Sequence, residues 1–310
     1  MPPRYGNTGG QKFARRFAGV RCGRGNENNS NDGDGRNSKG FNNDNDDDKD
    51  GITMYDEYLQ LAIEAAQKAG DYLFKRKNIH VDAEYRRDIK LSSDKDSEKI
   101  IIDCLLSSEL PVLSEELGLI EGLGDKSGEN SDKLRWIVDP IDGTMNYFKG
   151  IDDLCCVSIA LFEDESPIFG VVNRFYCKEL YVGVVGKGAW INEAPIKASE
   201  VKLLSKSVFA TGFPNGMDMS GDSLTDFTRR VSCVKKVRML GSAALMAAFV
   251  ATGKIDAYFE QDIRLWDIAG AMAIVKAAGG AVRLDTIKSD FKCDFGAFAT
   301  TELMEEFYGS

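Results

Sequence analysis

The stretch from Arg135 to Tyr147 restricts the fold of this chain more than any other segment. It reads RWIVDPIDGTMNY, so an apolar run is followed at once by a proline between two aspartates. The apolar run suits a buried strand, and Pro140 removes a backbone donor and is expected to end the strand there. Asp139 and Asp142 should then lie at the carboxyl end of a strand, the edge at which ligands usually bind in layered α/β folds.

The residues after this strand predict an anion site beside the two acids. Gly143 and Thr144 would offer free backbone N–H groups if a helix began there, as Thr144 and Asn146 suggest. Two acids at the end of a core strand are costly to bury unless they bind cations. Cations at the acids and an anion at the helix start together indicate a site for a phosphate ester.

Further carboxylates occupy comparable positions elsewhere in the chain. Asp94 lies in the first turn of a helix that Ser93 is expected to cap, Glu115 follows a short strand, and Asp267 opens a late helix. Taken singly, each of these acids is more typical of a helix cap or a solvated surface than of a ligand. Strand ends and helix starts can converge in a layered fold, so together they predict one acidic site.

Two other phosphate-binding motifs are absent from the sequence. Phosphatases of the haloacid dehalogenase class use Asp-x-Asp-Gly-Thr, but Pro140 stands two residues before Asp142, where that motif has its nucleophile. No G-x-x-x-x-G-K-[ST] sequence of the P-loop type occurs, and the glycines from Gly183 to Gly188 are expected in a turn.

Composition narrows the choice of partner, metal and compartment. A net charge of −10 argues against a nucleic-acid polymer as partner, and no apolar run approaches the ~18 residues that cross a membrane. The seven cysteines contain no C-x-x-C, which favours a reducing, cytoplasmic compartment over disulfides or zinc. His80 is the sole histidine, so a metal site must be built from oxygen, which favours Mg²⁺ or Mn²⁺.

The chain divides at about Met54. Residues 1–53 are dominated by Asn, Gly and Asp without periodic apolar positions, which predicts a disordered low-complexity tail. The first 26 residues are basic and contain no acid, so import into an organelle stays open beside a plain solvated tail. Residues 54–310 are predicted to form the folded domain.

The folded part is expected to mix helices and strands. After two helices, four strand-like runs separated by turns predict an antiparallel meander, and strands then alternate with helices. A polar, glycine-rich loop is expected at residues 118–132. Strands are predicted at residues 111–113, 136–138, 155–162, 168–174, 180–185, 189–192, 208–211, 237–240 and 257–260, and helices at residues 54–76, 93–105, 222–230, 241–252 and 266–280.

Three separated motifs now carry a family resemblance. The sequences DPIDGTMN from Asp139, EE at Glu115 and WDIA at Trp266, with AGG from Ala278, resemble the inositol monophosphatase family over Met54 to about Phe307. The resemblance implies an α/β fold of the sugar-phosphatase type, a layered αβαβα sandwich. It also implies a homodimeric phosphomonoesterase without a covalent intermediate, which uses two or three Mg²⁺ ions, with Mn²⁺ possible as a substitute.

The resemblance also assigns roles to residues of this chain. The implied metal ligands are Glu115, Asp139, the backbone carbonyl of Ile141, Asp142 and Asp267. The implied catalytic residues are Asp94 and Thr144, which help to activate a water, together with Glu115. The implied substrate contacts are Asp142, Gly143, Thr144, Gly241, Ser242, Ala243 and Glu260.

The residues after the DPIDGT motif bear on the substrate. Relatives acting on 3′-phosphorylated adenine nucleotides tend to continue with Lys-Glu-Phe, whereas this chain continues with Met145-Asn146-Tyr147. Inositol 1-phosphate is therefore the first candidate, and a 3′(2′),5′-bisphosphate nucleotidase or a fructose-1,6-bisphosphatase is the alternative. An inactive relative that serves as a binding or scaffold subunit is the alternative from another class. Ser114 departs from the family pattern, which commonly has glycine before the two glutamates.

Overall fold

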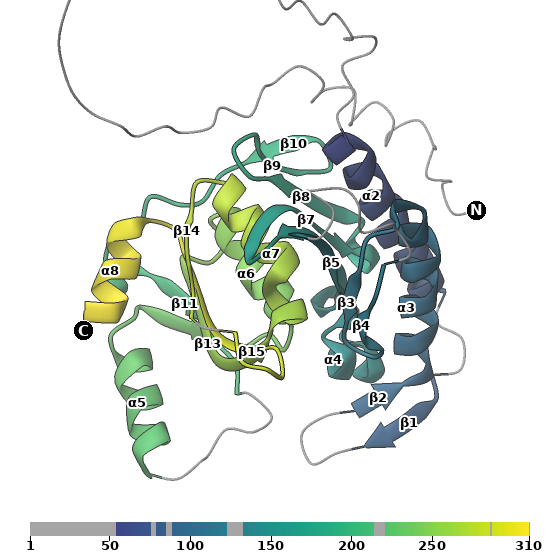
Figure 1. The fold of residues 1–310 in the computed structure, drawn as a ribbon. Coiled ribbons are helices and arrows are strands. Elements are labelled where there is room, and N and C mark those ends of the chain that lie inside the picture. The colour runs from purple at the N-terminus through teal and green to yellow at the C-terminus, as the bar shows by residue number, and fades with distance from the viewer. Residues whose placement is uncertain are drawn as a thin grey trace, which may run out of the picture.

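A computed structural model describes residues 54–75, 79–84, 89–122, 133–213, 221–285 and 287–309. The disordered tail predicted for residues 1–53 lies outside these residues, as do residues 123–132 of the predicted loop. Within the described residues the chain forms five layers in the order αβαβα (Figure 1), which confirms the predicted sandwich.

Helices form the first, third and fifth layers. One outer pair covers an eight-stranded sheet, a second pair lies between the two sheets, and a third pair lies against the far side of a five-stranded sheet (Figure 1). The three pairs are α2 (Met54–Phe74) with α3 (Ser92–Leu105), α6 (Ala243–Ala251) with α7 (Leu265–Ala277), and α5 (Gly221–Ser232) with α8 (Thr301–Gly309). A short helix, α4 (Thr144–Lys149), follows the central strand β5.

The eight-stranded sheet contains the predicted meander. Its strand order is β10-β9-β8-β7-β6-β5-β3-β4, and all neighbours are antiparallel except the parallel pair β3 and β5. Its strands are β3 (Val112–Ser114), β4 (Gly118–Ile120), β5 (Leu134–Asp142), β6 (Cys156–Glu163), β7 (Ser166–Arg174), β8 (Glu179–Val184), β9 (Gly188–Ile191) and β10 (Ala194–Ile196). The prediction of a loop from residue 118 was wrong at its start, because β4 turns back and pairs with β3.

The five-stranded sheet is mixed. Its strand order is β12-β11-β13-β15-β14. Strand β11 pairs in parallel with β12 and β13, and β15 pairs antiparallel with β13 and β14. Its strands are β11 (Val208–Ala210), β12 (Lys236–Arg238), β13 (Ala257–Arg264), β14 (Ala281–Leu284) and β15 (Lys292–Phe298). A small separate hairpin pairs β1 (Val81–Glu84) with β2 (Ile89–Leu91).

The sequence predicted that strand β5 would end at Pro140, and this prediction was wrong. The strand continues to Asp142. Asp139 pairs with Ser158 and Asp142 with Cys156, so the strand holds one extra residue between these two pairs. Such a bulge tolerates a residue without a backbone donor. Residues three apart normally face opposite sides of a strand, but the extra residue places Asp139 and Asp142 on the same side.

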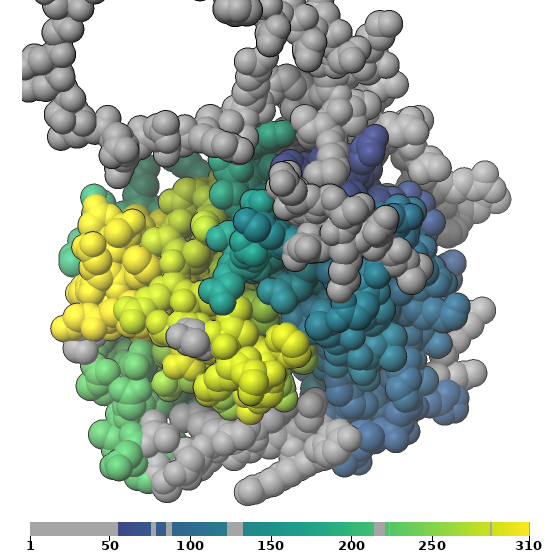
Figure 2. All heavy atoms as spheres, in the orientation of Figure 1, coloured from purple at the N-terminus to yellow at the C-terminus, as the bar shows by residue number. Residues whose placement is uncertain are grey.

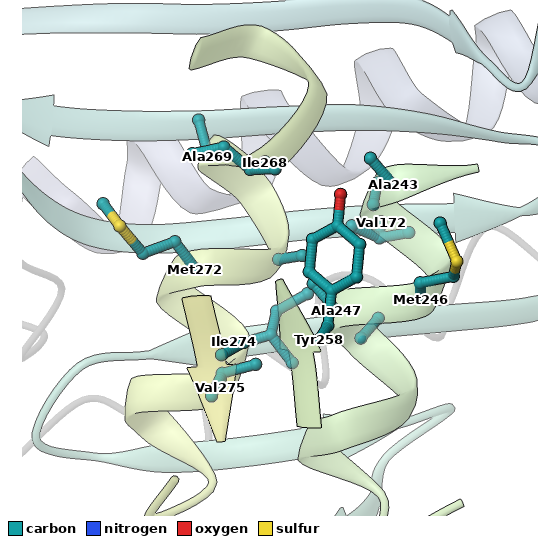
Figure 3. Close-up of a cluster of buried hydrophobic side chains, with 14 of the residues drawn as sticks. Val172, Ala243, Met246, Ala247, Tyr258, Ile268, Ala269, Met272, Ile274 and Val275 are labelled. Carbon is teal, nitrogen blue, oxygen red and sulfur yellow. The ribbon is translucent and has the colours of Figure 1, made fainter. Parts of the chain in front are cut away.

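The helices of the middle layer are apolar on every side. All residues of α6 are buried, as are most residues of α7, because sheets cover both of their faces. Figure 3 shows Tyr258 of β13 among Ala243, Ala247 and Ile274 of these two helices. This packing fixes the starts of α6 and α7 relative to both sheets.

Helix α2 is amphipathic, as its sequence predicted. Ala62, Ala65, Ala69 and Leu73 are buried against the first sheet, while charged residues occupy its exposed side. None of the helices in the described part of the chain combines the length and apolar character needed to cross a bilayer.

Candidate active site

The carboxyl end of β5 lies where the starts of three helices meet. Thr144 at the start of α4 donates to Asp94 of α3, and the start of α6 donates to Asp142. Glu115 and Asp267 also act electrostatically on Asp139, so the five predicted carboxylates lie in one region. In Figure 2 the blue N-terminal part of the domain and the yellow C-terminal part lie on either side of the teal middle of the chain.

Asp139 is buried at the bulge, with 1% of its surface exposed. One of its oxygens accepts a hydrogen bond from the Ile141 N–H at 3.0 Å. Burial raises the pKa of this carboxyl well above its usual range, and the charges of Glu115, Asp142 and Asp267 raise it further. A carboxylate in this position is stabilised by any cation that enters the site.

Asp142 is held by donors from the start of α6. Ser242 Oγ donates to its Oδ2, and the N–H groups of Ala243 and Ala244 donate at 3.1 and 2.9 Å. The Cys156 thiol lies 3.7 Å from the same oxygen. Burial raises the pKa of Asp142 to about 6, although these hydrogen bonds favour its charged form. The structure thus places Ser242 and Ala243 against Asp142, and such a role was not foreseen from sequence.

Asp94 lies in the first turn of α3 and connects two elements. Its Oδ2 accepts from the Leu91 N–H at 2.7 Å, and its Oδ1 lies 3.4 Å from Thr144 Oγ1. Burial raises its pKa to about 8. The prediction that Ser93 caps this helix was wrong. The helix begins at Ser92, so Ser93 lies inside it, and the Asp94 carboxylate accepts a hydrogen bond from the N–H of the capping residue, Leu91.

Thr144 connects Asp94 to the bulge. Its hydroxyl is 2.9 Å from the backbone oxygen of Ile141, the carbonyl implied as a metal ligand. Gly143 before it has φ +85°, and a Cβ there would lie 2.7 Å from the Leu154 oxygen. Glycine is therefore required where β5 turns into α4.

Glu115 is paired with a lysine that the sequence did not single out. The ammonium of Lys90 contacts one oxygen each of Glu115 and Glu116. The turn that carries these glutamates is fixed by Glu98, which accepts from Ser114 Oγ and, at 3.1 Å, from the Glu116 N–H. Ser114, the departure from the family pattern, thus contributes a hydroxyl donor to this turn.

Asp267 and Glu260 approach from the five-stranded sheet and its helix. Asp267 is half-buried in the first turn of α7 and accepts from the Arg264 N–H at 3.3 Å. Burial raises its pKa well above the usual range, and the charges of Glu115, Asp142 and Glu260 add to this. Burial also raises the pKa of Glu260 to about 7, although the Tyr258 hydroxyl donates to it at 2.9 Å.

Two further residues shape the space around these acids. Gly212 faces Glu260, and a Cβ there would lie 2.4 Å from the carboxylate. Asn146, which the sequence suggested as a clue to substrate, donates to the backbone oxygens of Leu154 and Leu240 at 2.8 Å each. Gly241 packs against the Asn146 side chain, so both residues support the site from behind.

The donor set fits hard divalent cations. The converging ligands are carboxylate and carbonyl oxygens, which Mg²⁺ and Mn²⁺ prefer. Burial raises the pKa values of Asp139, Asp142 and Asp267, and the charges of neighbouring acids add to this for Asp139 and Asp267, so a cation bound between them would stabilise their charged forms. In the described residues no group of three or more His, Cys, Asp or Glu side chains is arranged so that it could hold a metal ion.

Comparisons with known proteins identify the family to which the chain belongs. Residues 54–291 match the model of the inositol monophosphatase family. The chain is 36% identical over 246 residues to Inositol monophosphatase 3 of Solanum lycopersicum, covering 76% of this chain and 88% of the relative. It is 34% identical over 230 residues to Nus factor SuhB of Xylella fastidiosa, covering 72% and 80%.

A solved structure gives the same result. The inositol monophosphatase from Anabaena superposes with a TM-score of 0.69 at 30% identity, covering 83% of this chain and 96% of the other. The shared fold, the matched residues and the converging acids lead to one conclusion. The chain belongs to the inositol monophosphatase family and is a phosphomonoester hydrolase.

Proposed function

We propose that this chain hydrolyses a small sugar or polyol phosphate, with inositol 1-phosphate as the first candidate, by a metal-dependent attack of water. The observation that carries the proposal is the convergence of buried and half-buried carboxylates near Thr144, whose pKa values burial raises, with a further rise from neighbouring acids for Asp139 and Asp267. Such acids are stabilised when divalent cations bind between them. Two or three Mg²⁺ ions, with Mn²⁺ as a substitute, would be held by Glu115, Asp139, the Ile141 carbonyl, Asp142 and Asp267.

Bound Mg²⁺ would neutralise the phosphate dianion and lower the pKa of a water from ~16 towards ~7–9. The residues of the chain then supply position and a proton acceptor. Thr144 Oγ1 lies between Asp94 and the Ile141 carbonyl, so its hydroxyl orients the water and passes the proton to Asp94. A carboxyl with a pKa of about 8 suits this task near neutral pH. The N–H groups of Gly143 and Thr144 would bind the phosphate oxygens.

Substrate recognition is assigned to the five-stranded sheet. Glu260 can accept hydrogen bonds from two hydroxyl groups of a polyol, and Tyr258 keeps its carboxylate in place. Gly241, Ser242 and Ala243 are proposed as further substrate contacts, although Gly241 packs against Asn146, and Ser242 and Ala243 bind Asp142.

The test is a substrate panel with and without Mg²⁺. After metal is stripped with a chelator, kcat/KM is measured on inositol 1-phosphate, a 3′,5′-bisphosphonucleotide and fructose 1,6-bisphosphate. We expect hydrolysis only with Mg²⁺ and the highest kcat/KM on inositol 1-phosphate. A strong preference for the bisphosphonucleotide or for fructose 1,6-bisphosphate would change the proposed substrate. Equal rates with and without metal would reject the proposed mechanism.

A binding role is the alternative from another class. One relative bears the name Nus factor, so a catalytically silent protein with the same fold has to be tested. The absence of hydrolysis on a broad panel of phosphomonoesters, with Mg²⁺ and with Mn²⁺, would favour this alternative.

We also propose that residues 54–310 act as the phosphatase domain of a cytoplasmic homodimer, with residues 1–53 as a disordered appendage. The alternative for the basic start of the chain is import into an organelle. Light scattering tests the dimer, and kcat/KM measured on residues 54–310 alone tests the boundary. A monomeric mass, or loss of activity without residues 1–53, would contradict these assignments.

A further inference from the structure

Strand β13 contains a bulge between Glu260 and the start of α7. Glu260 pairs with Phe295 of β15 and Ile263 pairs with Cys293, so β13 holds one extra residue between these two pairs. Residues an odd number apart normally face opposite sides of a strand, but the extra residue keeps Ile263 in the same buried cluster as Tyr258. The bulge therefore sets the path of the chain from Glu260 to α7.

Asp262 lies in this bulge with a left-handed backbone. Its φ is +55°, a region in which a residue with a Cβ is strained. Aspartate is one of the few residues that tolerate this region, because its short side chain can form hydrogen bonds nearby. Its N–H donates to Asp294 Oδ1 of β15 at 2.9 Å. Contacts around Asp262 must therefore hold the backbone in this conformation.

Two lysines hold the Asp262 carboxylate. Lys288 Nζ donates to its Oδ1 at 2.8 Å, and Lys292 Nζ donates to its Oδ2 at 2.9 Å. Although burial acts to raise it, the pKa of Asp262 lies below its ordinary value, because both lysines hydrogen-bond to the charged form. Each carboxylate oxygen thus has its own ammonium partner. We call these three residues the β13 clamp.

The turn that supplies Lys288 also holds the first residue of α7. The Lys288 N–H donates to the backbone oxygen of Lys292 at 2.8 Å, which closes the turn. The backbone oxygen of Phe291 in this turn accepts from the Leu265 N–H at 2.9 Å. The β13 clamp therefore joins the strand that carries Glu260 to the turn that supports the start of α7.

The position of Glu260 depends on the path of its own strand. Within the described part of the chain its carboxylate accepts from the Tyr258 hydroxyl at 2.9 Å, and Tyr258 belongs to the same strand. Gly212 faces the carboxylate so closely that a Cβ there would lie 2.4 Å from it. A change in the path of β13 would move the carboxylate out of the place beside Gly212 into which it fits.

We propose that Asp262 is a positioning residue for substrate recognition, which sets where Glu260 meets the hydroxyl groups of a polyol phosphate by holding the bulge of β13. This inference rests on the proposed function, because it requires Glu260 to bind polyol hydroxyls. Asp262 acts only through Glu260. Loss of the β13 clamp should therefore weaken binding of the polyol and leave the chemistry at the eight-stranded sheet unchanged.

Steady-state kinetics of Asp262→Gly test this. Glycine adopts a φ of +55° without strain, so the variant removes the contacts of the clamp and adds no backbone strain. We expect KM for inositol 1-phosphate to rise about fivefold with kcat nearly unchanged. Both constants for 4-nitrophenyl phosphate, which has no polyol, should stay the same. Asp262→Asn tolerates the same φ and keeps an acceptor for one lysine, so its KM should rise less.

Glu193 offers a matched control. It also has a positive φ, +70°, but it is exposed in the turn between β9 and β10, at one edge of the eight-stranded sheet. Glu193→Gly makes the same exchange of an acid for glycine and should leave KM unchanged for both substrates. An equal rise in KM for inositol 1-phosphate in this variant would indicate a general effect of the lost charge and would overturn the inference.

Other results also decide. An unchanged KM for inositol 1-phosphate in Asp262→Gly, or an equal loss on both substrates, overturns the inference and leaves the proposed function intact. If circular dichroism shows that Asp262→Gly is misfolded, the double variant Lys288→Ala and Lys292→Ala is measured instead, with the same outcomes. A wild-type chain that hydrolyses 4-nitrophenyl phosphate with Mg²⁺ but not inositol 1-phosphate overturns the inference and the proposed substrate together.

Discussion

The two sheets hold their acids in different ways. Asp142, at the end of β5 in the eight-stranded sheet, accepts from Ser242 Oγ and from the N–H groups of Ala243 and Ala244. Glu260 of β13 in the five-stranded sheet accepts from Tyr258, a residue of the same strand, and faces Gly212. The first acid is fixed by another layer of the fold, whereas the second is fixed from within its own strand.

This contrast fits a division of the site between two tasks, metal binding and substrate binding. Divalent cations require ligand oxygens at set positions, which several donors from separate elements provide. A polyol must be able to enter and leave, and the Glu260 carboxylate, which fits only because residue 212 is glycine, has Tyr258 as its single hydrogen-bond donor within the described part of the chain. The eight-stranded sheet is therefore expected to carry catalysis, and the five-stranded sheet to carry substrate choice.

The largest effect is expected at the eight-stranded sheet, from Asp139→Asn. Loss of a metal-ligating charge should lower kcat by at least about a thousandfold, since a bound metal contributes several kcal/mol to the transition state. The metal-free variant should melt at the same temperature as the wild type or higher, because the amide removes like-charge repulsion among Asp139, Glu115 and Asp142. Steady-state kinetics and thermal melting measure the two effects.

Asp256, directly before β13 of the other sheet, is the matched control. It is also buried, but it accepts from Ser199 Oγ at 2.6 Å and from the Val208 N–H at 2.8 Å, away from the site. Asp256→Asn should lower the melting temperature and leave kcat nearly unchanged. Full activity of Asp139→Asn at saturating Mg²⁺ would break the division of tasks between the sheets.

The next largest effect is expected from Asp94→Asn. Asparagine can still accept from the Leu91 N–H, so α3 should keep its start, but the proton acceptor beside Thr144 is lost. We expect kcat to fall by about a hundredfold or more with little change in KM. Thr144→Val should reproduce this loss and Thr144→Ser should largely restore activity. A change confined to KM would show that Asp94 serves substrate binding instead.

The sequence predicted the fold better than it predicted the contacts within the site. The periodic apolar runs predicted the meander from β6 to β9 and helices α2 and α7, because a buried face imposes its period on the sequence. The bulge in β5 was not predicted, since Pro140 alone suggests the end of a strand. The short strand β4 was also missed, because its three residues follow a turn and carry no periodic pattern.

Contacts between distant residues explain the rest of the shortfall. Lys90 pairs with Glu115, 25 residues away, and Ser242 binds Asp142, 100 residues away. No local pattern identifies both partners of such a pair, so only the fold shows which residues meet. The sequence did contain a signal that Lys90 has a partner. A lysine between two apolar residues of a strand needs an acidic partner if the side of the strand that it faces is covered.

A smaller effect is expected at the five-stranded sheet, from Glu260→Gln. The amide can accept from Tyr258 but binds polyol hydroxyls less strongly than a carboxylate does. We expect kcat/KM on inositol 1-phosphate to fall by about ten- to thirtyfold, while the rate on 4-nitrophenyl phosphate, which has no polyol, stays unchanged. An equal loss on both substrates would mean that Glu260 supports the metal site, and the two sheets would then not divide their tasks.

The smallest effect is a pH-dependent difference in stability between the metal-free wild type and Glu260→Gln. Burial raises the pKa of Glu260 from an ordinary 4.5 to about 7 in the folded protein. Between these values the folded state holds a proton that the unfolded state has released, so wild-type stability falls as pH rises through this window. Glutamine does not titrate, so the variant should gain a few degrees in melting temperature relative to the wild type from pH 4.5 to 7.

Above pH 7 this difference should stay constant, because Glu260 is then ionised in both states. Thermal melting of both proteins in chelator-containing buffers at several pH values measures it, and the shared titration of the other acids cancels in the comparison. A difference that does not change with pH would mean that the carboxylate is stabilised as well in the folded protein as in water. The charge of Glu260 would then be held more firmly than that of Asp142, whose pKa burial raises to about 6, and the contrast between the two sheets would be reversed.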